Sequence, residues 1–253
     1  EGFSHLDLSN HAFFYCRHTL GVKSNRYLPL TLSKQRERER SSEFLVQSKI
    51  VTAAVGRPDK FDVPGYQYQY LDMVGAILAS TGGRHVHIGN LNSQQLTRLN
   101  ESLLKHGIDP SKFKHIPWVE SVSQALIEQG VHLYIASFPY GGGKSQVEAM
   151  AAGMPTIIHR NYRSRVLCGI DLGYPGVFTW GDECDLQAVL ENLTPSLLQL
   201  HSKYARKHFE RYHAEDRFVD AIQHPTTDET SVNPLANVYC DGLQAFLDEE
   251  ADL

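Results

Sequence analysis

The sequence predicts an α/β fold, with a parallel sheet and helices on both of its faces. From residue 49 onward, short apolar runs alternate with longer amphipathic ones, which is the pattern of βα units. Glycines follow several amphipathic runs at positions where helices commonly end. Three consecutive glycines also separate one apolar run from a helix of small residues, as is typical at the edge of a parallel sheet.

Each of the first three predicted strands is followed by a helix. The apolar runs that read as strands are 50–55, 85–88 and 113–118. The first helix is predicted at 66–80, and the second carries four leucines on one face, Leu96, Leu99, Leu103 and Leu104. Ser121 is suited to cap the third helix, which runs to Gln129.

The second half of the chain continues this alternation. We predict one complete βαβ unit from a strand at 131–136, the glycine turn at 138–143, a helix at 144–152 and a strand at 156–159. A further strand is expected near Val177. Two helices follow, from Asp185 and from Pro195, where proline suits the first helical position.

The 253 residues suffice for one main domain with appendages. We expect this domain at 49–222, preceded at 1–48 by a connector or the remnant of an acceptor domain. A linker and an acidic tail are expected at 223–253. The run at 34–40 alternates in charge and has the composition of a solvated segment.

Composition argues against several classes of partner. The net charge of -5, with acids and bases mixed along the chain, creates no broad basic field for nucleic acid or anionic membrane. The four cysteines form no C-x-x-C pair, which argues against a zinc knuckle and a disulfide framework. No apolar run approaches the roughly 20 residues that cross a bilayer. We expect a cytoplasmic protein without a membrane span.

Gly141, Gly142 and Gly143 connect the fourth strand to its helix. Because glycine has no Cβ, backbone N–H groups are able to converge there on one point, and the helix dipole adds to the attraction for an anion. Lys144 and Ser145 would supply a charge and a hydroxyl. The turn is therefore predicted to bind phosphate. The alternative is that the glycines only permit a tight turn and close helix packing.

The tripeptide Gly143-Lys144-Ser145 is similar to the end of a P-loop. That motif requires another glycine five residues before Gly143, where this sequence has Phe138. The chain also shows no second strand that ends in a magnesium-binding aspartate. A P-loop that hydrolyses nucleotides is therefore disfavoured.

Glu148 lies about one turn into the predicted helix, among small residues. Its carboxylate is too far from the first N–H groups to cap its own helix. It is suited to accept hydrogen bonds from the two hydroxyls of a ribose beside the phosphate, because a carboxylate in apolar surroundings needs partners. The alternative is an exposed glutamate, the commoner fate of this residue type.

The segment 138–155, FPYGGGKSQVEAMAAGMP, resembles the donor-binding segment of GT-B glycosyltransferases. Its second half is most similar to retaining family 4 enzymes, and its first half to the O-GlcNAc transferase and bacterial protein N-glucosyltransferase group. The resemblance extends over about 49–222. It implies a Rossmann-like domain that binds a nucleotide diphosphate sugar, in the first place a UDP-sugar, while a separate N-terminal domain holds the acceptor.

The resemblance also implies site residues. Arg57 and Lys60 would neutralise the donor diphosphate and stabilise it as leaving group, although Pro-Asp between them is also common in plain surface turns. The backbone from Gly142 to Gln146 would cradle the diphosphate, and Glu148 would hold the ribose. Trp118 lies where such enzymes hold the base, and would stack on it or simply pack. No cofactor and no metal is required besides the nucleotide sugar.

Two features depart from the family pattern. Family 4 enzymes carry another glutamate eight residues before the one that matches Glu148, and here that position is Tyr140. No complete acceptor domain precedes residue 49, so the acceptor, whether protein, glycan or lipid, stays open. We expect the donor-binding part of a glycosyltransferase. The alternatives are a non-catalytic nucleotide-sugar-binding module and, less favoured, an atypical P-loop hydrolase.

Three polar residues follow the strand after the glycine helix. His159, Arg160 and Arg163 are expected at the same edge of the sheet as the glycine turn. They are either part of the site or a polar loop.

Overall fold

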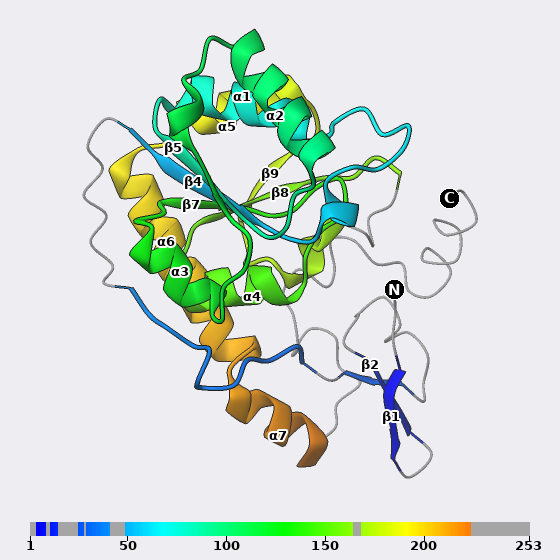
Figure 1. Cartoon of the computed structure of the whole chain (residues 1–253). Coiled ribbons are helices and arrows are strands. Elements are labelled where there is room, and N and C mark those ends of the chain that lie inside the picture. The colour runs from blue at the N-terminus through cyan, green and yellow to red at the C-terminus, as the bar shows by residue number, and fades with distance from the viewer. Residues whose placement is uncertain are drawn as a thin grey trace.

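The computed structural model describes residues 4–8, 11–14, 25–27, 29–40, 49–163 and 168–223. Its main body is a six-stranded sheet in which all neighbouring strands are parallel, between two layers of helices (Figure 1). The strands are β4 (Val51–Val55), β5 (Arg84–Ile88), β6 (Phe113–Ile116), β7 (Leu133–Ile135), β8 (Thr156–His159) and β9 (Phe178–Trp180). The predicted α/β, Rossmann-like fold class is confirmed.

Helices cover both faces of the sheet (Figure 1). One face carries α1 (Tyr70–Thr81), α2 (Ser93–Lys105) and α5 (Glu183–Glu191). The other carries α3 (Val122–Glu128), α4 (Lys144–Ala151) and α6 (Pro195–Tyr212), which leads into α7 (Glu215–Gln223). Successive strand residues enter the two cores in turn: Leu133 and Ile135 pack on the α1 side, and Tyr134 packs on the α3 side.

The strand order is β6-β5-β4-β7-β8-β9. From β4 the chain builds outward to one edge of the sheet, returns to the centre at β7, and builds outward to the other edge. The loops after β4 and β7 therefore leave the sheet in opposite directions and separate at its carboxyl edge. Open α/β sheets bind their ligands at such a switch point.

Most element ends follow local signals in the sequence. Ser121 caps α3 as predicted, accepting a hydrogen bond from the Gln124 N–H at 3.3 Å. Two expectations are wrong. Helix α1 begins at Tyr70 rather than at residue 66, because a turn with Gly65 at a φ of 71° comes first. Leu104 is 70% exposed and does not share the apolar face of α2.

Residues 29–40 form a strap over the helices. Most of the run at 34–40 is exposed, as expected for a solvated segment, and only Glu37 and Arg40 are partly buried. Leu32 is buried in a cluster with side chains of α4 and α6. Arg206 of α6 forms ion pairs with Glu37 at 2.7 Å and Glu39 at 3.5 Å. Arg40 donates to the Val131 carbonyl, and burial lowers its pKa to about 10.

A small second sheet lies within the first 27 residues, where no strand was expected. It consists of β1 (Ser4–Leu8), β2 (His11–Phe14) and β3 (Asn25–Tyr27), with β1 antiparallel and β3 parallel to β2. Figure 1 shows it apart from the main sheet. The predicted tail at 223–253 lies outside the described residues except for Gln223, the last residue of α7.

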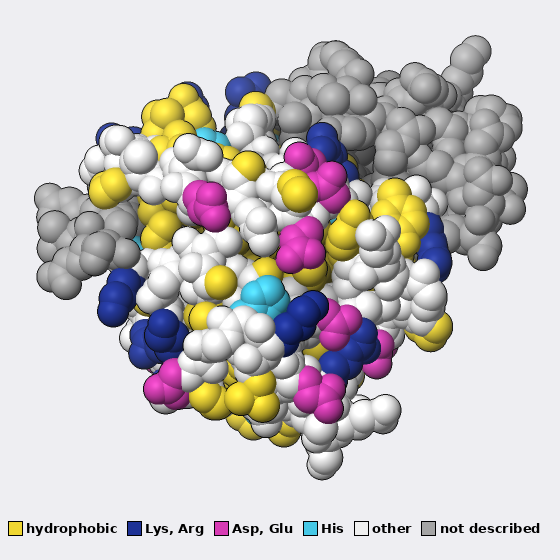
Figure 2. Space-filling view, turned by 90° about the horizontal axis from the view of Figure 1, so that it is seen from above, with side chains coloured by type: hydrophobic (Ala, Val, Ile, Leu, Met, Phe, Trp, Pro, Cys, Tyr) yellow, Lys and Arg dark blue, Asp and Glu magenta, His cyan; other side chains and the backbone are white. Residues whose placement is uncertain are grey.

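Basic and acidic side chains are interspersed over the face that Figure 2 shows. Among the described ion pairs, the Arg98 guanidinium of α2 pairs with both Asp62 and Asp72, at 3.0 and 2.5 Å. This described face therefore offers mixed charge rather than the broad basic field that binds nucleic acid.

Candidate functional site

Two loops meet at the carboxyl ends of the neighbouring strands β4 and β7. The loop after β4 forms a short 3-10 helix, η2 (Pro58–Lys60), and the loop after β7 carries the glycine turn. The Lys60 ammonium donates to the Gly141 carbonyl at 3.0 Å, and the Tyr140 N–H donates to the Lys60 carbonyl at 3.3 Å. The fold thus holds Lys60 against a turn that lies 81 residues away in sequence.

Crowding explains why two of the turn residues are glycines. A Cβ on Gly141 would lie 2.3 Å from the Cys168 carbonyl oxygen. A Cβ on Gly142 would lie near three polar atoms, at 2.7 Å from Ser145 Oγ, 3.1 Å from Ser137 Oγ and 3.6 Å from Lys60 Nζ. None of the three glycines has a positive φ. Space, rather than an unusual backbone conformation, therefore requires glycine here.

Two hydroxyls beside Gly142 have hydrogen-bonding capacity left. Tyr134 donates to Ser145 Oγ at 3.1 Å, so the proton of Ser145 is available to another acceptor. Burial raises the pKa of Tyr134 above its usual value, which keeps this donor protonated. Ser137 is 2% exposed, and its Oγ has no hydrogen-bond partner among the described residues. Leaving such a group unpaired costs about 1–3 kcal/mol, which a ligand oxygen would relieve.

The start of α4 is also open. Gly143 is its N-cap residue, and no side chain caps the helix. The first N–H groups of α4 therefore lack acceptors within the helix, and together with the helix dipole they attract an anion. Lys144 is exposed at this end. Gln146 is buried and donates to the Gly169 carbonyl at 3.1 Å, which ties the helix start to the loop before η5 (Ile170–Leu172).

Glu148 is 4% exposed, so the alternative of an exposed helical glutamate is wrong. One of its carboxylate oxygens accepts a hydrogen bond from the Val122 N–H at 2.6 Å, which caps the neighbouring helix α3. The other oxygen has no hydrogen bond among the described residues. The ribose-binding role of Glu148 stays a prediction, and the structure adds a second role that sequence spacing did not show.

Trp118 and Arg57 both follow strand ends at the carboxyl edge of the sheet, and both are exposed. Trp118 follows β6 and is 76% exposed, so the alternative that it simply packs is wrong. The Arg57 side chain is 78% exposed and pairs with Asp59 at 3.0 Å. Exposed pairs of this kind contribute about 0–1 kcal/mol, so Arg57 is able to exchange Asp59 for another anion at little cost.

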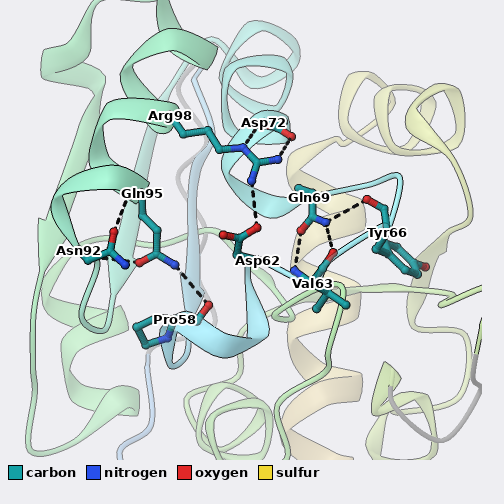
Figure 3. Close-up of polar contacts among 9 residues, drawn as sticks. All are labelled: Pro58, Asp62, Val63, Tyr66, Gln69, Asp72, Asn92, Gln95 and Arg98. Carbon is teal, nitrogen blue, oxygen red and sulfur yellow. Dashed lines mark hydrogen bonds and ion pairs between the residues drawn. The ribbon is translucent and has the colours of Figure 1, made fainter. Parts of the chain in front are cut away.

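A polar clamp holds the loop that carries Lys60 (Figure 3). The Gln95 side chain donates to the Pro58 carbonyl at 3.4 Å, and Arg98 bridges Asp62 and Asp72. Gln69 accepts from the Val63 N–H at 3.0 Å and donates to the carbonyls of Val63 and Tyr66. The loop is therefore fixed from both sides of η2, which preorganises Lys60.

The polar residues after β8 mostly serve the structure. His159 is buried, bonds Tyr66 Oη at 2.6 Å, and burial lowers its pKa to about 4. Arg160 pairs with Asp185 at 2.9 Å. Sequence reasoning missed Ser137 and the loop at Cys168, because no local pattern indicates which distant groups approach the glycines.

The described residues contain no group of three or more His, Cys, Asp or Glu side chains arranged to hold a metal. No helix among them is sufficiently long and apolar to traverse a bilayer.

A parallel sheet with this strand order and a glycine turn at its switch point defines a Rossmann-like domain. Solved structures of similar fold include those of GT-B glycosyltransferases. Anabaena HepE in complex with UDP and glucose matches 79% of this chain and 56% of its own at a TM-score of 0.60 and 13% identity. The O-GlcNAc transferase of Thermobaculum terrenum matches 79% of this chain and 39% of its own, at 0.53 and 14%.

A third structure matches more of the chain. TarM of S. aureus, in complex with UDP and sugar ligands, matches 90% of this chain and 40% of its own at a TM-score of 0.50 and 12% identity. The chain therefore spans about half the length of the structures that it matches, or less. No protein-family model matches the sequence, and no curated protein does. At these identities the likeness shows the fold alone.

Proposed function

We propose that this chain is the donor-binding part of a glycosyltransferase and binds the diphosphate of a UDP-sugar at the glycine turn. The proposal rests on one observation. Three polar atoms converge on Gly142, beside a helix start that no side chain caps: Lys60 Nζ, Ser137 Oγ and Ser145 Oγ. An ammonium, two hydroxyls and free N–H groups match the oxygens of a diphosphate. The UDP and glucose held by HepE support the uridine choice.

The proposed position of the diphosphate also suggests which residues bind the base and the ribose of the donor. Trp118 is open for stacking with the base, and the free carboxylate oxygen of Glu148 is suited to a ribose hydroxyl. Arg57 turns from Asp59 to the diphosphate when the donor binds. In the transfer step, negative charge grows on the departing UDP, and Lys60 with the α4 start stabilises it electrostatically. This arrangement requires no cofactor and no metal. The acceptor lies on a part of the enzyme outside the described residues.

Calorimetry tests the proposal directly. The chain is titrated with UDP, GDP, ADP and UDP-glucose, each with and without Mg²⁺. We expect UDP to bind with selectivity over ADP and without a requirement for Mg²⁺. Magnesium-dependent binding of ATP or GTP would instead support the P-loop alternative. Absence of binding by every nucleotide would contradict the proposal.

One observation keeps a second function in view. Tyr140 stands where family 4 enzymes have a sugar-binding glutamate, and its N–H is bonded to the Lys60 carbonyl. A non-catalytic module would bind UDP-glucose equally well but transfer no sugar. Release of UDP from UDP-glucose by the full-length protein, measured with a coupled assay and a mixture of glycan and peptide acceptors, separates the two functions.

A further inference from the structure

An aromatic pair lies at the carboxyl edge of β8, beside the glycine turn. The Tyr162 ring stacks on Tyr66 with ring centroids 4.4 Å apart and planes 13° apart. Tyr66 is 4% exposed, whereas Tyr162 is 55% exposed. Tyr66 covers one face of the Tyr162 ring, Tyr68 approaches the ring edge-on with centroids 6.3 Å apart, and more than half of the Tyr162 surface is exposed.

Hydrogen bonds hold Tyr162 in a single orientation. Its N–H donates to Tyr66 Oη at 3.2 Å, and its own hydroxyl accepts from the Gln67 N–H at 3.1 Å. Tyr66 Oη is fixed by His159 Nε2 at 2.6 Å. Gln69, the centre of the polar clamp in Figure 3, binds the Tyr66 carbonyl at 2.9 Å. An exposed aromatic ring with this many constraints is preorganised, so that ordering it on binding costs little.

The pair is linked to the glycine turn through its neighbours. The Asn161 amide donates to the Pro139 carbonyl at 3.0 Å, and its side-chain oxygen accepts from the Arg163 N–H at 2.8 Å. The Arg163 guanidinium lies 5.9 Å from the Tyr162 ring centroid and donates to the Gly65 carbonyl. A ligand on the exposed part of the ring would therefore meet an aromatic surface and a cation beside the glycine turn.

We propose that the Tyr162 ring, backed by Tyr66, is a stacking platform for a pyranose. One face of a pyranose presents several C–H bonds in the same direction, and these interact favourably with the negative face of an aromatic ring. Sugar hydroxyls at the rim would accept hydrogen bonds from Arg163. Only the choice of a sugar as the ligand of this platform rests on the proposed function. Its geometry does not depend on the phosphate site.

Two sources supply a pyranose at this edge, namely the hexose of the donor and a sugar of the acceptor. The test measures both in the 253-residue chain. Calorimetry with UDP and with UDP-glucose reports the donor hexose, and saturation-transfer NMR with cellobiose reports a free sugar. The variant is Tyr162→Ala, and Tyr162→Phe keeps the ring while removing the hydroxyl. Tyr204→Ala is the matched control, because Tyr204 is 45% exposed on α6.

We expect Tyr162→Ala to weaken the binding of either UDP-glucose or cellobiose about fivefold, while UDP binding stays unchanged. Tyr162→Phe and Tyr204→Ala should bind as the original chain does. An effect on UDP-glucose assigns the platform to the donor hexose, and an effect on cellobiose assigns it to the acceptor.

If the Tyr162→Ala variant binds both UDP-glucose and cellobiose as tightly as the original chain does, the platform is overturned. If that variant does not fold, transfer of saturation from tyrosine ring protons to sugar protons in the original chain decides the question, and its absence also overturns the platform. If the original chain does not bind UDP, the proposed function is contradicted instead. The cellobiose measurement still tests the platform in that case.

Discussion

Helices α3 and α4 pack on the same face of the sheet but begin in opposite ways. At the start of α3, Ser121 Oγ accepts from the Gln124 N–H and Glu148 accepts from the Val122 N–H, so two protein acceptors satisfy the end. At the start of α4, Gly143 offers no side chain, and nothing caps the helix. The chain has the residues to close a helix end and leaves this one open, which indicates a place for a ligand.

Polar groups of the core also differ from those at the glycine turn. In the core, Thr52 Oγ1 bonds His85 at 2.7 Å, His85 bonds Tyr70 Oη at 2.8 Å, and Tyr70 Oη bonds His87 at 2.9 Å. Among the described residues, both His87 Nε2 at the end of this network and Ser137 Oγ at the glycine turn lack a partner. We call the bonded core groups closed. They should govern stability, whereas Ser137, which lies beside Gly142, should govern binding.

The largest expected effect is acid destabilisation through the closed core network. Burial lowers the pKa of His85 and of His87 to about 3, whereas an unfolded histidine titrates near 6.5. Below pH 6.5 the unfolded chain takes up protons that the folded chain does not, so stability falls as the pH falls from 6.5 towards 3. Each such histidine removes about 1.4 kcal/mol per pH unit. Urea unfolding between pH 7 and pH 5 measures this slope.

A variant without one of these histidines shows how much of the pH dependence of the free energy of unfolding comes from that histidine. His85→Gln should lower the pH dependence by about 1.4 kcal/mol per unit, and UDP affinity at pH 7 should not change. A free energy of unfolding that is flat between pH 7 and pH 5 would show that the network is not closed as described.

Lys60→Met should produce the largest loss of binding at the open site. Removing a charge-assisted hydrogen bond to phosphate costs about 1.5–3 kcal/mol, which is about 10- to 150-fold in the dissociation constant for UDP. The exposed Lys105→Met, on α2, is the control. Calorimetry with UDP compares the two variants, and equal affinity in both would remove Lys60 from the site.

The sequence predicted the fold because βα periodicity and end signals are local. Ser121, Pro195 and the glycine helix were located correctly from neighbouring residues alone. Only the family resemblance assigned Lys60 and the glycine turn to the same diphosphate. The structure brings Lys60 Nζ within 3.0 Å of the Gly141 carbonyl, and the diphosphate itself stays a prediction.

Contacts between distant segments were not predictable. The cap that Glu148 provides to α3 depends on two helices packing side by side, and Ser137 reaches the site only through the path of the turn. The contacts of the strap were missed for the same reason: its charged run is mostly exposed, as expected, but the pairing of Glu37 with the distant Arg206 has no local signal.

Placing a carboxylate at the open start of α4 should raise the stability of the fold and weaken the binding of UDP. In Gly143→Asp, the new carboxylate would interact favourably with the helix dipole at the start of α4, with a gain of about 0.3–1 kcal/mol. The space permits it, because a Cβ there meets only flexible side-chain atoms, the nearest being Leu30 Cδ2 at 3.2 Å. The same carboxylate would repel a diphosphate, and we expect UDP to bind about tenfold more weakly. Thermal unfolding and calorimetry measure the two effects. A tighter complex with UDP would contradict an anion site at this end.

The smallest expected effects come from a pair of serine variants that separate closed from open hydroxyls. Ser121→Ala removes the cap of α3 and should cost about 1 kcal/mol of stability, with UDP affinity unchanged. Ser137→Ala removes a buried hydroxyl that has no partner among the described residues, so stability should stay the same or rise, while UDP binds about three- to fivefold more weakly. Both substitutions delete one oxygen at a buried serine, so the difference between them reports only what each oxygen contacts. If Ser137→Ala lowered stability as Ser121→Ala does and left UDP binding intact, the glycine turn would be another closed part of the fold, and the phosphate site would have to lie elsewhere.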